Sequence, residues 1–217
     1  MPMLELEVFT FNPFAENTYI LFNDQKEALI IDPGCYEAFE KTRLVNFIEK
    51  NSLKPVGLYN THCHVDHVLG NAFVKEKYGL KLGIHEKDDP TLKAVEVMAP
   101  AFGINDYHSA TPDFFISEED KITIGSEVLE VLFVPGHAPG HVVFIHRSSG
   151  MIIGGDVLFK ESIGRTDLPG GNHEQLLKNI RKKMYKLPDH FRVYPGHGPM
   201  TTIGHEKIYN PFVRFDG

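Results

Sequence analysis

The sequence predicts an α/β fold in which two β-sheets form a sandwich flanked by helices. Apolar residues recur at every second position in both halves of the chain, as in Leu4–Val8 and Lys121–Ile124. This period is typical of half-buried strands. Apolar residues recur at helical spacing in Tyr36–Lys50 and His173–Leu187. A polar loop at residues 61–67 has strands on both sides of it, and two sheets rather than one are therefore expected.

Further strands are expected where short apolar runs end at turn signals. Three such runs are Thr18–Phe22, Ala28–Ile31 and Val128–Val134. The second run is followed by Asp32-Pro33-Gly34, a sequence that favours a turn. Pro188 ends the last predicted helix, because proline cannot continue a helical hydrogen-bond pattern.

The segment Glu86–Phe115 is the least regular part of the chain, with prolines among scattered aromatic residues. One interpretation is a surface helix and loop with a few core anchors. The other is a wall or lid beside a functional cleft, since long loops in compact domains tend to be functional. The sequence leaves both open.

Length and composition predict one domain covering residues 1–217. A chain of 217 residues buries roughly 70% of its unfolded surface. No apolar run approaches the roughly 20 residues of a membrane span, and Met1–Glu5 lacks the features of a signal peptide. Because Cys35 and Cys63 are the only cysteines, a disulfide framework is not expected and a cytoplasmic location is predicted.

The charge balance argues against a nucleic-acid partner. The formal net charge is −7, whereas binding to a phosphate backbone normally requires a basic face. The densest basic run, Arg181-Lys182-Lys183, lies on a predicted helix with an apolar opposite face and is interpreted as a solvated surface. We expect a small-molecule substrate, no nucleic acid and no membrane, and the sequence does not indicate an oligomeric state.

The most informative motif is Thr61-His62-Cys63-His64-Val65-Asp66-His67, which holds three imidazoles and a carboxylate. Burying such groups unpaired costs several kcal/mol, so a bound divalent metal is the natural explanation. The motif lies between a predicted strand and a predicted helix, a loop position from which side chains can reach a cleft.

Three further metal-binding side chains stand beside glycine or proline, each after a strand-like run. They are His137 in Pro135-Gly136-His137, Asp156 in Gly154-Gly155-Asp156, and His197 in Pro195-Gly196-His197. A single histidine at a strand end is more often structural. Seven such residues at strand ends or in one loop favour a metal centre. Imidazole and carboxylate ligands suit zinc, iron or manganese.

These motifs resemble the metallo-β-lactamase superfamily, and within it the type II glyoxalase (hydroxyacylglutathione hydrolase) branch. The resemblance runs from about Thr10 to Phe212 and includes the tail Thr202–Lys207. It implies the αββα sandwich of two mixed β-sheets flanked by helices, in a compact single-domain form.

The resemblance also implies a ligand set for two divalent metals, with zinc as first choice and iron or manganese as alternatives. One metal would be held by His62, His64 and His137. The second would be held by Asp66, His67 and His197, with Asp156 bridging the two ions. Asp66 and Asp156 would act in catalysis as well as in ligation.

The activity implied is hydrolysis of 2-hydroxyacyl thioesters such as S-lactoylglutathione. An alternative is a mononuclear iron persulfide dioxygenase of the same superfamily, with His62 or His64, His137 and Asp156 as iron ligands. A third reading is a non-catalytic metal-binding module. The intact second ligand set argues against both.

Three nearby residues have two readings each. Arg165 matches a basic substrate-contacting position of the glyoxalases, but a salt bridge with Asp167 explains it equally well. Cys63 is expected to be a packed thiol rather than a ligand. His141 is expected to support a metal ligand by a hydrogen bond rather than to bind metal itself. The longer glyoxalases carry a C-terminal helical domain that contacts glutathione, and the resemblance here is expected to be to a compact form without that domain.

Overall fold

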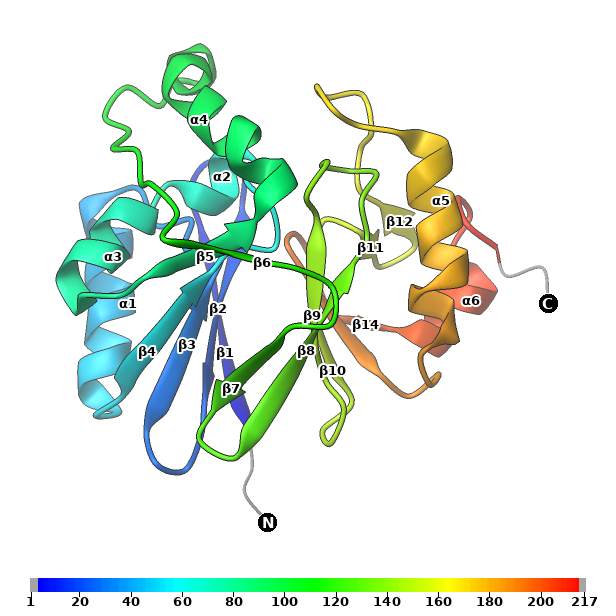
Figure 1. Ribbon diagram of the computed structural model, residues 1–217, viewed down its shortest axis with the longest axis horizontal. Coiled ribbons are helices and arrows are strands. Elements are labelled where there is room, and N and C mark those ends of the chain that lie inside the picture. The colour runs from blue at the N-terminus through cyan, green and yellow to red at the C-terminus, as the bar shows by residue number, and fades with distance from the viewer. Residues whose placement is uncertain (1–3, 215–217) are drawn as a thin grey trace. The chain divides into compact units, whose positions relative to one another are not determined.

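The computed structural model describes residues 4–214 and confirms the predicted fold class. It contains two six-stranded mixed β-sheets flanked by helices (Figure 1). The chain divides into two compact units. The first comprises the chain up to Ile116 together with Thr123–Val128, and the second comprises Ser117–Ile122 with the chain from Leu129 onward. The single domain over residues 1–217 stays a prediction. Of the segment Met1–Glu5, in which no signal peptide was expected, Met1–Met3 lie outside the described residues.

The sheet of the first unit follows the order of the sequence. Its strands are β1 (Glu5–Phe11), β2 (Glu16–Phe22), β3 (Glu27–Ile31), β4 (Lys54–Tyr59), β5 (Leu82–His85) and β6 (Phe114–Ile116). The first three strands are antiparallel, and β3 to β6 are parallel to one another. The carboxyl ends of β3 and β4 therefore lie at the same edge of the sheet.

Helices connect the parallel strands of the first unit. They are α1 (Ala38–Lys50), α2 (Val65–Val68), α3 (Asn71–Tyr78) and α4 (Asp89–Met98), with 3-10 turns η1 (Glu86–Asp88) and η2 (Ala99–Phe102). Leu44 and Ile48 of α1 belong to the same buried core as Ile20 and Ile30 of the sheet. Every residue of β2 is buried, the polar residues Glu16, Asn17 and Thr18 at its start as well as the apolar run Tyr19–Phe22. The packed sheet gives the loops at its edge a rigid base.

The second sheet has the order β14-β13-β10-β9-β8-β7. Its strands are β7 (Lys121–Ile124), β8 (Glu127–Phe133), β9 (Val142–His146), β10 (Met151–Gly155), β13 (Arg192–Pro195) and β14 (Thr201–Thr202). A small hairpin of β11 (Leu158–Phe159) and β12 (Ser162–Ile163) follows β10. β10 and β13 are parallel, so the residues that follow them leave the sheet at the same edge.

The helices of the second unit are α5 (His173–Lys182) and α6 (Ile203–Tyr209), with the 3-10 turn η3 (Met184–Lys186) after α5. Leu176 and Ile180 of α5 share a buried core with Ile152 and Val193 of the sheet. The helix begins at Asn172, whose side chain accepts a hydrogen bond from the backbone N–H of Gln175.

Two predicted helices differ in detail from the structure. The helix predicted over His173–Leu187 leaves α-geometry after Lys182 and ends in η3. Where one helix was predicted after the ligand motif, the structure has two short helices, α2 and α3, separated at Gly70, whose N–H donates to the carbonyl of Pro33 at 2.7 Å. The contact of Gly70 with Pro33 replaces the helical bond that would join α2 to α3.

The irregular segment before β6 contains η1, α4 and η2. Leu92 and Val95 of α4 are buried, whereas Val97 is 83% exposed. This matches the interpretation as a surface helix with a few core anchors, and the role of lid stays a prediction. Within the described residues, each helix is too short or too polar to span a lipid bilayer.

Candidate metal centre

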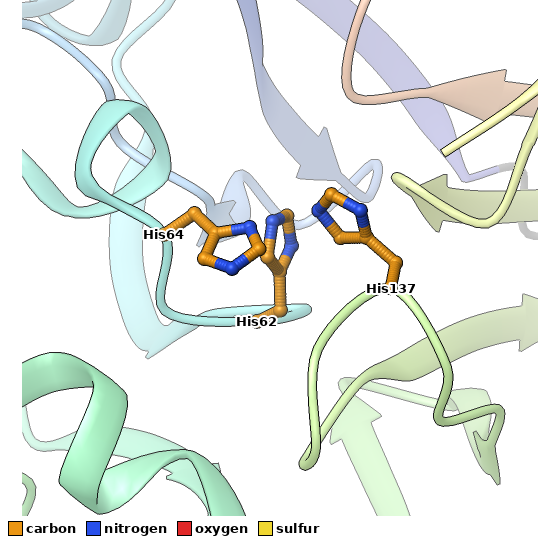
Figure 2. Close-up of side chains that lie close together, drawn as sticks. All are labelled: His62, His64 and His137. Carbon is orange, nitrogen blue, oxygen red and sulfur yellow. The ribbon is translucent and has the colours of Figure 1, made fainter. Parts of the chain in front are cut away.

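The loop after β4 places four of the predicted ligands close together. His62 and His64 lie on the loop itself (Figure 2), while Asp66 and His67 lie on α2. The ring centroid of His62 is 4.8 Å from that of His64 and 4.1 Å from that of His67. His62, Asp66 and His67 are buried. The strand-to-helix loop thus gathers the imidazoles as the spacing of the motif predicted.

Asp32, at the carboxyl end of β3, is a buried partner of this loop. Its Oδ1 accepts a hydrogen bond from the backbone N–H of Thr61 at 2.7 Å, and its Oδ2 accepts one from Thr61 Oγ1 at 2.6 Å. Oδ2 also lies 3.2 Å from Nδ1 of His67. The possible ligand atoms of Asp32, His62 and His67 all lie within 4.8 Å of one another.

The contact with Asp32 decides the orientation of the His67 ring. A carboxylate can only accept, so Nδ1 of His67 carries the proton and its Nε2 is left with a lone pair. That Nε2 lies 3.6 Å from Oδ2 of Asp66. A carboxylate behind a histidine is the arrangement by which metal sites fix the tautomer and direction of an imidazole ligand.

In the sequence Asp32 was interpreted only as part of a turn, and this role was missed. The local signal was a carboxylate directly after the apolar run Ala28–Ile31, which alone does not show that the same sheet edge also presents the His62 loop. The residue has φ of +50°, a left-handed conformation that aspartate tolerates better than most residues.

Glu16 adds a second buried carboxyl group behind His67. Its Oε2 accepts a hydrogen bond from Thr18 Oγ1 at 2.9 Å, and its Oε1 lies 3.9 Å from His67 Nδ1. Burial raises the pKa of the Glu16 carboxyl group well above its ordinary value. Glu16 lies two residues before the predicted strand Thr18–Phe22 and was not singled out in the sequence.

The second unit brings its three predicted ligands together around one oxygen. Oδ2 of Asp156 lies 3.5 Å from Nε2 of His137 and 3.6 Å from Nε2 of His197. Nδ1 of His137 lies 2.7 Å from the backbone carbonyl of Arg165. Since a carbonyl only accepts, Nδ1 donates and Nε2 of His137 keeps its lone pair for the shared centre.

The backbone around Asp156 is tightly fitted. Asp156 follows β10 directly, and its N–H donates to Nε2 of the buried His141 at 2.9 Å. A Cβ on Gly164 would come within 1.9 Å of the Asp156 carbonyl oxygen, so only glycine allows this approach. The side chain of His141 therefore contacts the backbone amide of Asp156, a predicted ligand. This contact agrees with the supporting role expected for His141.

Arg165 forms the salt bridge that was one of its two readings. Its Nε and one terminal nitrogen each donate to a different carboxylate oxygen of Asp167, both at 2.7 Å. Both side chains are largely exposed. The guanidinium beside Asp167 lowers the pKa of that carboxyl group to about 2. The predicted substrate contact of Arg165 stays a prediction.

The two cysteines are buried free thiols. Burial raises the pKa of the Cys63 thiol well above its ordinary value and that of the Cys35 thiol to about 12. Among the described residues, neither cysteine belongs to a group of side chains close enough to hold a metal ion together. The donors that gather in the two units are thus imidazole nitrogens and carboxylate oxygens, a set that suits divalent zinc, iron or manganese.

The chain belongs to the metallo-β-lactamase superfamily, as its motifs predicted. A sequence profile described as "Metallo-beta-lactamase superfamily" matches residues 11–197. The family implies that the chain binds divalent metal, and its members include metal-dependent hydrolases. At this level of description the chain is a metallo-hydrolase.

Three comparisons with individual proteins support this assignment. The chain is 37% identical over 212 residues to hydroxyacylglutathione hydrolase GloC of Haemophilus influenzae, covering 97% of this chain and 98% of that protein. It is similar to the crystal structure of BLEG-1 B3 metallo-β-lactamase, with 35% identity, a TM-score of 0.88, and coverage of 96% and 99% of the two chains. It is also similar to TTHA1623 in a di-iron-bound form, with 33% identity, a TM-score of 0.85, and coverage of 95% and 100%.

Proposed function

We propose that this chain is a binuclear metal-dependent hydrolase of 2-hydroxyacyl thioesters such as S-lactoylglutathione. The observation that carries the binuclear part is the approach of both His137 and His197 to the same oxygen of Asp156. A carboxylate oxygen that two imidazoles approach could bridge two ions, each bound by one of those imidazoles. Similarity to a hydroxyacylglutathione hydrolase over nearly the full length of both proteins supports the thioester part.

The proposed ligand sets draw on both units. His62 and His64 of the first unit and His137 of the second would hold one ion. Asp66 and His67 of the first unit and His197 of the second would hold the other, and Asp156 would bridge them. The proposal requires that the folded chain bring the two halves together around Asp156.

The chemistry of the residues fits such a centre. Divalent ions bound there would lower the pKa of a water molecule to about 7 and polarise the thioester carbonyl. The chain's own residues would orient these groups. Asp32 holds the His67 ring, the Arg165 carbonyl holds the His137 ring, and His141 holds the Asp156 backbone. Asp66 would also accept a hydrogen bond from the attacking water, and Asp156 would orient it.

Zinc is our first choice of metal, and iron or manganese is the alternative. The donor set does not distinguish these ions, because all three accept imidazole and carboxylate ligands. The similar structure in a di-iron-bound form supports iron as a real competitor. We also propose a cytoplasmic location from the cysteine usage, and no nucleic-acid partner from the net charge. The proposed partner is a small molecule.

The test is a substrate panel measured without oxygen. The panel contains S-lactoylglutathione, lactoyl-coenzyme A, a bacillithiol-type thioester and a β-lactam, the last because of the similarity to a lactamase. We expect the highest kcat/KM with a 2-hydroxyacyl thioester. Faster hydrolysis of the β-lactam would contradict the thioester assignment. In a separate aerobic assay, oxygen consumption with glutathione persulfide, together with no thioester hydrolysis in the panel, would support the iron persulfide dioxygenase instead.

A further inference from the structure

Two side chains from distant parts of the first unit hold the backbone of the loop that carries His62 to His67. Asp88, at the end of η1, accepts a hydrogen bond from the backbone N–H of Cys63 at 2.8 Å. Asn12, after β1, donates from Nδ2 to the backbone carbonyl of Asp66 at 2.9 Å. Neither residue belongs to the proposed ligand set, and neither was singled out in the sequence.

The Asp88 contact fixes the peptide unit that follows His62. Because the peptide bond is planar, holding the N–H of Cys63 also holds the carbonyl end of His62 and the start of the step toward His64. Asp88 is completely buried. It also occupies the N-cap position of α4, where an aspartate usually accepts from the helix's own amides. Its side chain makes no such cap bond and reaches the His62 loop instead.

The Asn12 contact fixes the peptide unit between Asp66 and His67. In a longer helix the carbonyl of Asp66 would accept from the N–H of Gly70, four residues on. That N–H instead donates to Pro33, and Asn12 supplies a donor to Asp66 in its place. Asn12 Nδ2 also donates to the carbonyl of Gly34 at 3.0 Å. One amide therefore ties the Asp66–His67 peptide to the turn after β3.

We propose that Asp88 and Asn12 are positioning residues, each serving one of the two metals. Asp88 orients the pair His62 and His64 of the first metal, and Asn12 orients the pair Asp66 and His67 of the second. This inference rests on the proposed binuclear function. It predicts that the two residues affect different ions, which a general loss of stability would not do.

The experiment compares two variants, each with a matched control, in the full-length protein. Asp88→Ala removes the acceptor for Cys63, whereas Asp88→Asn keeps an acceptor oxygen of the same reach. Asn12→Asp removes the donor to Asp66 and still tolerates the left-handed backbone of residue 12, whose φ is +52°. Asn23→Asp is its control, because Asn23 is an asparagine whose Nδ2 also donates a hydrogen bond, but to Glu27 within the β2–β3 turn.

Zinc affinity is measured by chelator competition in two backgrounds that isolate the ions. His197→Ala disables the second site and leaves the first, and His137→Ala does the reverse. In the His197→Ala background, Asp88→Ala should weaken zinc binding by about 10- to 100-fold, and Asn12→Asp should leave it unchanged. In the His137→Ala background the pattern should reverse. Asp88→Asn and Asn23→Asp should bind zinc as their parent backgrounds do.

Loss of both ions to the same degree in both backgrounds, or of neither, would overturn the positioning roles. Melting temperatures of the metal-free variants show whether each variant is folded at the assay temperature. In a folded variant, a change in zinc affinity is an effect on the metal site and not a consequence of unfolding. If Asp88→Ala does not fold, Asp88→Asn becomes the test of this residue. A folded Asp88→Asn variant that does not bind zinc as its parent background does would overturn the positioning role of Asp88. Failure of the parent protein to bind two ions would instead overturn the proposed function.

Discussion

Nδ1 of His67 lies 3.2 Å from Oδ2 of Asp32, and both side chains are buried. The same carboxylate accepts from the backbone N–H and the hydroxyl of Thr61, the residue before His62. Asp32 is thus a common support for the start of the ligand loop and for its last imidazole. The end of β3 therefore supports the ligand motif at both of its ends.

Asp32→Asn should weaken metal binding with little change in fold. Asparagine tolerates the left-handed backbone and can still accept from Thr61 N–H. It places an amide donor opposite the His67 ring or the Thr61 hydroxyl, where the carboxylate accepted. Metal affinity should fall by about 10- to 100-fold, the usual effect of losing the partner of a histidine ligand. Unchanged affinity, measured beside the control Asp113→Asn, would show that Asp32 does not support the site.

Asp156→Ala should abolish tight metal binding and reduce hydrolysis to the background rate. The substitution removes the one oxygen that both His137 and His197 approach. Metal content and turnover are measured together, with the exposed carboxylate variant Asp189→Ala as the control. Retention of two tightly bound ions in Asp156→Ala would rule out the bridging role.

Cys63→Ser should leave turnover within a few-fold of the parent enzyme. Cys63 is a buried free thiol and, among the described residues, does not join the groups of possible metal ligands around His62, so we assign it no ligand or nucleophile role despite its place between His62 and His64. The melting temperature of Cys63→Ser should fall, because a hydroxyl buried without a partner costs about 1–3 kcal/mol. Loss of hydrolysis in Cys63→Ser with its metal content intact would refute this assignment.

Arg165→Ala distinguishes a substrate contact from the observed ion pair with Asp167. If Arg165 grips a substrate carboxylate, KM for an acidic thioester should rise by roughly 10- to 100-fold, with kcat almost unchanged. An uncharged acyl thioester should be hydrolysed as before. Equal losses on both substrates together with lower thermal stability, and the same losses in Asp167→Ala, would assign the pair a structural role.

Local sequence patterns were sufficient to place the predicted ligands on the fold. Glycines beside His137 and Asp156 predicted sharp turns after strands, and the structure has these residues in the loop after β8 and directly after β10. The cluster of side chains between His62 and His67 could be predicted from the spacing of these residues alone. Strand periodicity and turn chemistry are properties of neighbouring residues, so one sequence can show them.

The supporting residues could not be found in this way. Asp32, Asp88 and Asn12 act on partners 29, 25 and 54 residues away in the chain. Each resembles an ordinary turn or cap residue in its local sequence, and only the packing of the sheet edge brings it to the ligand loop. Arg165 shows the same limit, since its pairing with Asp167 and a substrate contact are equally compatible with the sequence.

The most direct test of the account is the metal content of the purified protein, measured by elemental analysis before and after incubation with zinc, iron or manganese. Two complete ligand sets predict up to two ions per chain, with hydrolysis of a 2-hydroxyacyl thioester rising as the second ion binds. Partial occupancy before incubation agrees with a weaker second site. A single ion that none of the three added metals can supplement would contradict the binuclear centre.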